Sequence, residues 1–181
     1  MAGSTVPGPG SRGAVLAGRV RAAVDAILTL GPAIAATPPL GESANLGDGE
    51  DTWGPREVLA HVTEATAYWH GEIERILAGD PGEPGGPGEP AAPVPFGRTP
   101  NDVARVAILA RDRTLPATVL MARLSRDGAM LTDRIATLSD AELDRAGLHP
   151  TRGPMTVASV IDMTLASHFE GHAAQIRAAV G

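Results

Sequence analysis

The chain has 181 residues, a formal net charge of −6 and no cysteine. Without cysteine it can form neither disulfides nor thiolate–metal bonds, which leaves His, Asp and Glu as the possible metal ligands. The acidic balance argues against a nucleic-acid-binding surface. No stretch has the length of a membrane-spanning helix and no secretory signal is visible, so we expect a cytoplasmic protein without a membrane partner.

Aromatic residues make up only 3% of the chain, so its core must be built from Ala, Val, Leu and Ile, which favours closely packed helices. Residues 1–12 are rich in Gly, Pro and Ser and predict a disordered tail, and residues 13–181 are expected to form one domain. From Leu16 to Ile34, apolar residues recur at alternating intervals of four and three, which predicts an amphipathic helix. This helix should weaken at Gly31-Pro32.

The second helix is expected to begin at residues 53–55, because Pro55 suits the first turn of a helix. Its apolar stripe runs from Val58 to Ile76. Residues 79–99 are so rich in Gly and Pro that they cannot form a packed helix, and they predict an extended or mobile loop over the surface.

A short helix is predicted at 101–112, followed by a break at Pro116 and a third long helix over 116–138. Residues 139–143 predict a short capped turn, and the final helix should run from Thr156, its N-cap, almost to the last residue. We find no convincing strand in the sequence. The predicted fold is therefore all-α, a four-helix bundle with a long crossover loop between its second and third helices.

Two histidines of the last helix, His168 and His172, stand in line with the apolar residues Ile161, Leu165 and Ile176. A spacing of four residues places the two rings about 40° apart around the helix and about 6 Å apart along it. Two imidazoles so placed can bind one metal ion, and the helix backbone holds them rigidly. The motif is weak on its own, because a metal site needs a third ligand.

His61 is the candidate third ligand, because it lies at the edge of the apolar stripe of the second helix. If the second and last helices face one another, His61, His168 and His172 form a three-histidine site with an open position, as in catalytic metal centres. Taken singly, interior histidines are more often hydrogen-bonded core residues than ligands. Candidates for supporting or pocket roles, with solvated carboxylates or simple packing as the alternatives, are Glu57, Glu64, Trp69 and Gln175.

The segments WGPREVLAHVTEATAYW (53–69) and ASHFEGHAAQI (166–176) together resemble the DinB/YfiT-like superfamily of metal-binding four-helix proteins. In that superfamily a histidine in a W-x-x-x-E-V-L-x-H context joins two histidines of an H-x-x-x-H motif on the last helix. The resemblance implies that His61, His168 and His172 bind a divalent metal ion. Zinc or nickel is expected, with iron or manganese as alternatives.

The resemblance also implies a function, since the superfamily includes transferases and isomerases that use low-molecular-weight thiols such as bacillithiol and mycothiol. We expect a mycothiol-like thiolate to attack a small-molecule substrate in a pocket shaped by residues 79–99 and 101–115. The alternative is a non-catalytic bundle in which the ion is structural or sensory. A role on DNA conflicts with the acidic charge. The Ala-rich helical faces would also allow a homodimer.

Overall fold

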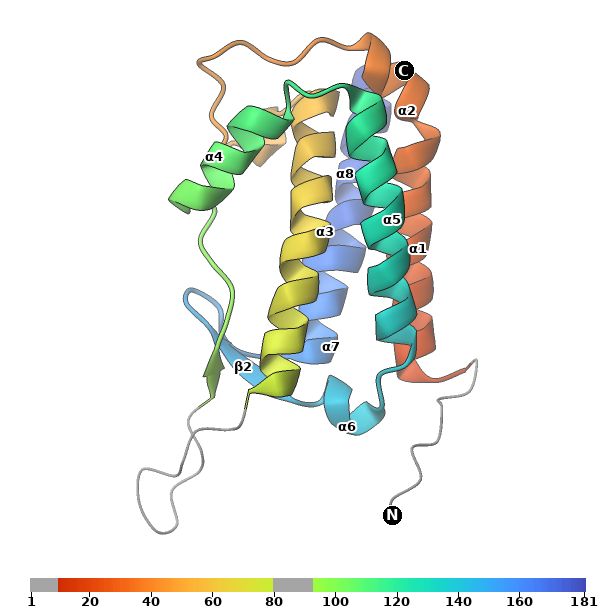
Figure 1. Cartoon of the computed structure of the whole chain (residues 1–181), viewed down its shortest axis with the longest axis vertical. Coiled ribbons are helices and arrows are strands. Elements are labelled where there is room, and N and C mark those ends of the chain that lie inside the picture. Colours follow the sequence, from red (N-terminus) through yellow and green to blue (C-terminus); the bar gives the residue numbers. More distant parts are fainter. Residues whose placement is uncertain (1–9, 80–92) are drawn as a thin grey trace.

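The computed structural model describes residues 10–79 and 93–181, which are mostly helical, as predicted (Figure 1). The longest helices of this part are α1 (Arg12–Thr29), α3 (Pro55–Ala78), α5 (Ala117–Ala136) and α8 (Ser167–Val180). α1 and α3 each pack against both α5 and α8, so the four helices lie side by side around a shared core. None of the described helices combines the length and the apolarity needed to cross a membrane.

The core between these helices is mainly aliphatic. Its fully buried side chains include Ile27 of α1, Leu59 of α3 and Leu124 of α5, and burying each such side chain contributes about 1.5–3 kcal/mol. α1 approaches the end of α5 closely at Gly13, where a Cβ atom would lie 2.7 Å from the carbonyl oxygen of Ile135. A glycine is therefore required for this packing.

α1 begins at Arg12 because the hydroxyl of Ser11 accepts a hydrogen bond from the Ala14 N–H and caps the first turn. Arg12 is the last residue of the tail that we predicted, and residues 1–9 of that tail lie outside the described residues. α1 ends at Thr29 and a separate short helix, α2 (Gly31–Ala36), follows. The predicted weakening at Gly31-Pro32 is thus confirmed.

The helices in the middle of the chain also begin at residues that favour the first turn of a helix. α3 has Pro55 in its first turn, and α4 (Val103–Asp112) follows Asp102, whose carboxylate caps the first turn. Pro116 separates α4 from α5, as predicted. The short helix α6 (Asp140–Leu143) is held by a capping box between Ser139 and Glu142.

The prediction that the chain has no strands is wrong. β1 (Val94–Pro95), β2 (Ala146–His149) and β3 (Gly153–Thr156) form a small sheet in which β1 runs parallel to β2 and β2 antiparallel to β3. These strands are too short to show an alternating pattern, and β1 pairs with a partner far along the chain. Gly153, with a φ of 73°, is the first residue of β3 and lets the chain leave the tight turn that follows β2.

The Gly/Pro-rich segment 79–99 is described only in part, because residues 80–92 lie outside the described residues. The described end of this segment, residues 93–99, is extended, as predicted. It packs against the rest of the protein and does not lie loosely over the surface. Val94 and Pro95 pair with β2, Phe96 is only 2% exposed, and the Gly97 N–H donates to the carboxylate of Glu72 at 2.5 Å. These contacts fix the chain before it enters the cavity region described below.

The last helical stretch is not one uniform α-helix. Thr156 caps the short α7 (Val157–Val160), as predicted, and a π-helix, η2 (Ile161–Ala166), joins α7 to α8. A π-turn takes in an extra residue, so a single α-helical phase cannot be carried from one side of it to the other. Beyond it Phe169 and His172 are buried, whereas 30% of the His168 side chain is exposed.

Candidate metal centre

The three histidines singled out in the sequence meet between α3 and α8. His61 projects from α3, and His168 and His172 project from α8. The ring centroid of His61 lies 5.1 Å from those of the other two, which lie 4.4 Å apart. His61 and His172 are almost fully buried, while His168 is partly accessible. The structure therefore brings the predicted triad together and leaves one member open to solvent.

Gln175, proposed from the sequence as a supporting residue, fixes the tautomer of His172. Its amide nitrogen donates to the carbonyl oxygens of Glu50 and Trp53, at 2.8 and 3.1 Å, so its Oε1 remains an acceptor. Oε1 lies 2.9 Å from His172 Nδ1, which must therefore carry the ring proton. The Nε2 lone pair of neutral His172 then faces His168 Nε2, 2.9 Å away. Metal-binding imidazoles are commonly oriented in this way.

Glu50 is a further member of this cluster, and it was missed in the sequence. It opens the short 3-10 helix η1 (Glu50–Thr52), in the connection that precedes α3. Glu50 Oε2 lies 3.1 Å from His168 Nε2 and 4.0 Å from His172 Nε2. The other carboxylate oxygen, Oε1, lies 3.8 Å from His61 Nε2. One carboxylate thus faces all three imidazoles.

Arg105 of α4 orients the Glu50 carboxylate. Its buried guanidinium pairs with Glu50 and donates to the carbonyl oxygens of Gly47 and Pro100, at 2.9 and 2.6 Å. Its Nη2 also lies 3.5 Å from His61 Nδ1. A guanidinium has no acceptor and cannot ligate a metal. Its role is to hold the connection that carries Glu50 and to offset the charge of the carboxylate.

These side chains fit a divalent metal ion. The ligand-type atoms of Glu50, His61, His168 and His172 all lie within 4.8 Å of one another. Ligand atoms held about 2.0–2.2 Å from one ion lie roughly 3–4 Å apart, and the separations given above range from 2.9 to 4.0 Å. His61 Nε2 is buried and has no hydrogen-bond partner among the described residues. Since buried polar atoms are rarely left unpaired, an ion is a natural partner for it.

The electrostatics favour the protonation states that a metal needs. Burial lowers the pKa of His61 well below its ordinary 6.5, and the neighbouring His172 and His168 lower it further. Burial likewise lowers the pKa of His172 to about 4. Burial raises the pKa of Glu50, but the hydrogen bond from His168 and the charge of Arg105 outweigh this effect, and the pKa lies below its ordinary 4.5. At neutral pH the cluster offers neutral buried imidazoles and an ionised carboxylate.

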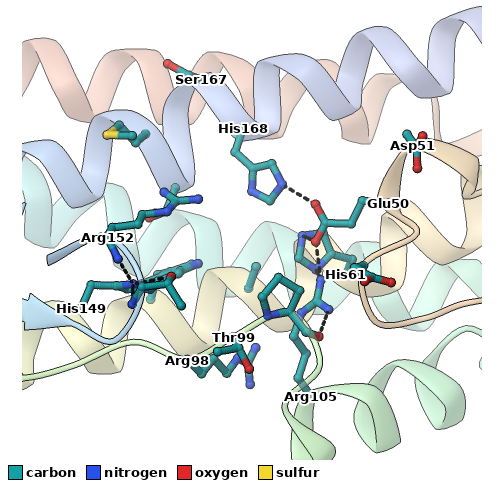
Figure 2. A pocket seen from close by; sticks show the side chains of 17 residues that line it. Glu50, Asp51, His61, Arg98, Thr99, Arg105, His149, Arg152, Ser167 and His168 are labelled. Carbon is teal, nitrogen blue, oxygen red and sulfur yellow. Dashed lines mark hydrogen bonds and ion pairs between the residues drawn. The ribbon is translucent and has the colours of Figure 1, made fainter.

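The cluster opens into a cavity of about 810 Å³ (Figure 2). Sites for small molecules commonly have volumes of about 300–1,000 Å³. Glu50 and His61 lie at one side of this cavity, and His149 and Arg152 lie at the other (Figure 2). Trp69, considered as a pocket residue from the sequence, lines the same cavity.

His149 is held in the cavity wall by contacts that the sequence did not reveal. It ends β2, and its ring stacks on Trp69 with centroids 6.3 Å apart. Its Nδ1 accepts from the backbone N–H groups of Thr151 and Arg152, both at 3.3 Å. Gly97 (φ 80°) lies so close that a Cβ atom there would be 2.3 Å from His149 Cδ2. These contacts keep the ring in one orientation.

The two carboxylates expected near His61 lie elsewhere. Glu57 is fully buried, accepts a hydrogen bond from the Leu40 N–H at 2.8 Å and pairs with Arg113 at 3.4 Å. Glu64 has a side chain only 6% exposed and pairs with Arg98. Neither bonds to a histidine of the described part, and neither is the solvated carboxylate that was the alternative. Each is drawn away from the cluster by a buried or half-buried arginine.

Weak signals existed for some of the missed residues. Glu50 lies three residues before Trp53, at the end of an acidic connection that leads into the second helix. Its position could have been suspected from the need for a carboxylate near a histidine triad. Arg105 is one of fifteen arginines and has no distinguishing pattern. His149 and Arg152 depend on a strand pairing that the sequence did not predict.

The fold and the cluster together define a mostly helical protein with a candidate divalent-metal centre made of histidine and glutamate. The sequence profile described as the DinB superfamily matches residues 17–176. The chain therefore belongs to the DinB superfamily, which confirms the resemblance drawn from its two histidine motifs. No curated protein and no solved structure matches the sequence.

Proposed function

We propose that the chain binds one divalent metal ion through His61, His168 and His172, with Glu50 as a further ligand, and that the ion serves catalysis. The observation that carries this proposal is that the cluster opens into a cavity of small-molecule size. The side chains of His168 and Glu50 are 30% and 31% exposed, and both residues line the cavity. Structural ions are usually enclosed by protein ligands, whereas catalytic ions remain accessible. Zinc or nickel suits this donor set, and iron or manganese is the alternative.

The proposed reaction is a transfer or isomerisation that uses a low-molecular-weight thiol of the mycothiol kind. A divalent ion, when bound, lowers the pKa of a thiol or water ligand and so supplies a nucleophile at neutral pH. In a transfer, the thiol sulfur forms a bond to an electrophilic carbon and the leaving group departs with the electrons of the bond that breaks. The thiol proton passes to solvent or to the leaving group. Membership of the DinB superfamily supports this reaction class.

The residues of the chain supply binding and orientation. Gln175 keeps the Nε2 lone pair of His172 directed at the cluster, and Arg105 keeps Glu50 beside it. Trp69 and His149 form a stacked wall against which a substrate can pack. These roles need no movement of the backbone, which is the condition for a preorganised site.

Metal content and thiol transfer, measured on untagged protein, test the proposal. We expect about one divalent ion per chain in the wild type and none in the double variant His61→Ala, His168→Ala, because the two remaining ligands cannot retain the ion. The single variant His168→Ala, altered at a part-exposed site, should lose both the ion and the turnover of thiol and electrophile. His70→Ala, on the same helix as His61 but outside the cluster, is the control that should keep both. Full activity of metal-free protein would remove the ion from the mechanism.

A structural ion is the second candidate, favoured by the burial of His61 and His172 between α3 and α8. An ion there would tie α3, α8 and the connection that carries Glu50, and its binding free energy would add to folding stability. This alternative predicts a large fall in the melting temperature on chelation, with no turnover of any thiol and electrophile. Turnover that depends on added metal would exclude it.

We further propose that the described helices form a four-helix bundle. The packing of α1, α3, α5 and α8 supports a four-helix bundle, and the connection from α3 to α5, which contains β1 and α4, would be its crossover. Association into a homodimer stays a prediction that size-exclusion chromatography with light scattering would test.

A further inference from the structure

The arginines that line the cavity differ in how their charges are balanced. Arg98 pairs with Glu64, with a contact of 2.6 Å, and its guanidinium lies over the ring of Tyr68. Arg105 pairs with Glu50. The side chain of Arg152 lines the same cavity but makes no ion pair or hydrogen bond to any residue in the described part of the chain. Within that part, its positive charge is therefore uncompensated.

The backbone of Arg152 is held in place, and its side chain lies on one side of the cavity. It lies in the turn between β2 and β3, and its backbone N–H donates to His149 Nδ1 at 3.3 Å. Figure 2 shows Arg152 beside His149, on the side of the cavity opposite Glu50 and His61. His149 adds no charge at neutral pH, because burial and the charge of Arg152 lower its pKa. This wall thus carries one positive charge.

The opposite side of the cavity has acidic residues. Glu50 and Asp51 lie there beside His61, and Asp48 and His168 line the same cavity. Glu50 is paired with Arg105 and would itself hold the ion, and Arg98 is paired with Glu64. Among the described residues, the guanidinium of the cavity lining that remains available to an anionic group is therefore that of Arg152. A substrate whose anionic group binds Arg152 would extend from there toward the histidine cluster.

We infer that the electrophilic substrate carries a carboxylate, which Arg152 binds while the reacting carbon lies toward the histidine cluster. This inference rests on the proposed function. A guanidinium presents a planar pair of donors that matches the two oxygens of a carboxylate. A single positive charge on the wall balances one carboxylate rather than a doubly charged phosphate group. The substrate class is accordingly a small acid with an electrophilic carbon.

A mercaptocarboxylate combines the thiol and the acidic group of the substrate in one molecule. Its sulfur would bind the metal ion, and its carboxylate would bind Arg152. The experiment loads the full chain with cobalt(II), whose visible spectrum changes when a thiolate binds, and titrates it with mercaptoacetate, mercaptobutyrate and mercaptohexanoate. Each acid is compared with the amide of the same length, which binds metal through sulfur but lacks the charge. The readout is a dissociation constant, independent of turnover.

For at least one chain length we expect the acid to bind roughly tenfold more tightly than its amide, as a charge-assisted contact would provide. Arg152→Gln should remove this preference and leave binding of the amide unchanged. Arg177→Gln, which changes another exposed arginine that does not line the cavity, should retain it. A preference that is absent at every length, or that survives in Arg152→Gln, overturns the carboxylate site while the metal site stands. Failure to bind cobalt at all would overturn the proposed function and this inference with it.

Discussion

Two arginines of the α4 region hold the same connection by the same chemistry, but their surroundings differ. Arg105 pairs with Glu50, and Arg113, just after α4, pairs with Glu57. Both guanidinium groups also donate to backbone carbonyl oxygens of the connection over residues 37–52. In each case one arginine joins a carboxylate and a stretch of irregular backbone.

The two carboxylates differ in exposure and in what faces them. The Glu57 side chain is 0% exposed, and its Oε2 has no hydrogen-bond partner among the described residues. The Glu50 side chain is 31% exposed and faces three imidazoles at one side of an open cavity. The buried pair of Glu57 and Arg113 can affect only folding. The accessible pair of Glu50 and Arg105 lies beside His61 Nε2, which has no hydrogen-bond partner among the described residues, and is arranged to receive a ligand. Glu57 should therefore govern stability and Glu50 should govern metal binding.

The largest expected effect is on the buried pair. Glu57→Ala leaves the guanidinium of Arg113 buried without its counter-ion, which should lower the free energy of unfolding by about 3 kcal/mol. Urea denaturation of the metal-free protein measures this change, and metal stoichiometry should stay at the wild-type value. Glu74→Ala, which removes a half-exposed partner of Arg134, is the control and should cost less than about 1 kcal/mol. If Glu57→Ala lost the metal ion while its free energy of unfolding stayed the same, Glu57 would govern metal binding and not stability.

The accessible pair should respond in the opposite way. Glu50→Gln keeps the shape of the side chain but removes its charge, so the affinity for a divalent ion should fall roughly 10- to 100-fold, or by about 1.4–2.7 kcal/mol. A glutamine oxygen at position 50 can still accept from Arg105, and Glu50 is part-exposed, so the free energy of unfolding of the metal-free protein should fall by less than in Glu57→Ala. Competition with a chelating dye measures the affinity. Unchanged affinity would mean that Glu50 only neighbours the ion.

The long helices and the histidine triad could be predicted because their signals are local. The spacing of apolar residues gives the phase of each helix, and the phase places His61 and His172 on inward faces. His168 follows from His172, because both lie in α8 and are four residues apart. The phase of residues 161–166 relative to α8 could not be predicted, because no pattern there reveals the extra residue in the turn of the π-helix η2.

The other half of the cavity could not be predicted, because it is built by contacts between distant segments. β1 and β2 come together only in the folded chain, and the turn that follows carries Arg152. Glu50 lies in a connection without periodicity, and its position depends on Arg105 and on Gln175. Helix periodicity therefore predicted the three histidines, but it predicted neither Glu50 nor the cavity wall that carries His149 and Arg152.

The smallest expected effect is the contribution of His149 to the pH dependence of the free energy of unfolding. Burial lowers the pKa of His149 below its ordinary 6.5, with Arg152 adding to the shift and Glu72 opposing it. Because the unfolded chain then takes up this proton at a higher pH than the folded chain does, the free energy of unfolding should fall as the pH drops through 6.5 and level off below the folded pKa.

His149→Asn tests this effect, because an asparagine oxygen can replace Nδ1 as the acceptor for the turn N–H groups but does not titrate. Urea denaturation of metal-free protein between neutral and mildly acidic pH should give a shallower slope for this variant than for the wild type, since His61 and His172 still contribute. An equal slope for His149→Asn and wild type would show that the folded chain protonates His149 as readily as the unfolded chain does. The cavity wall beside Arg152 would then carry a second positive charge in mild acid, and a doubly charged anion would suit it better than a single carboxylate.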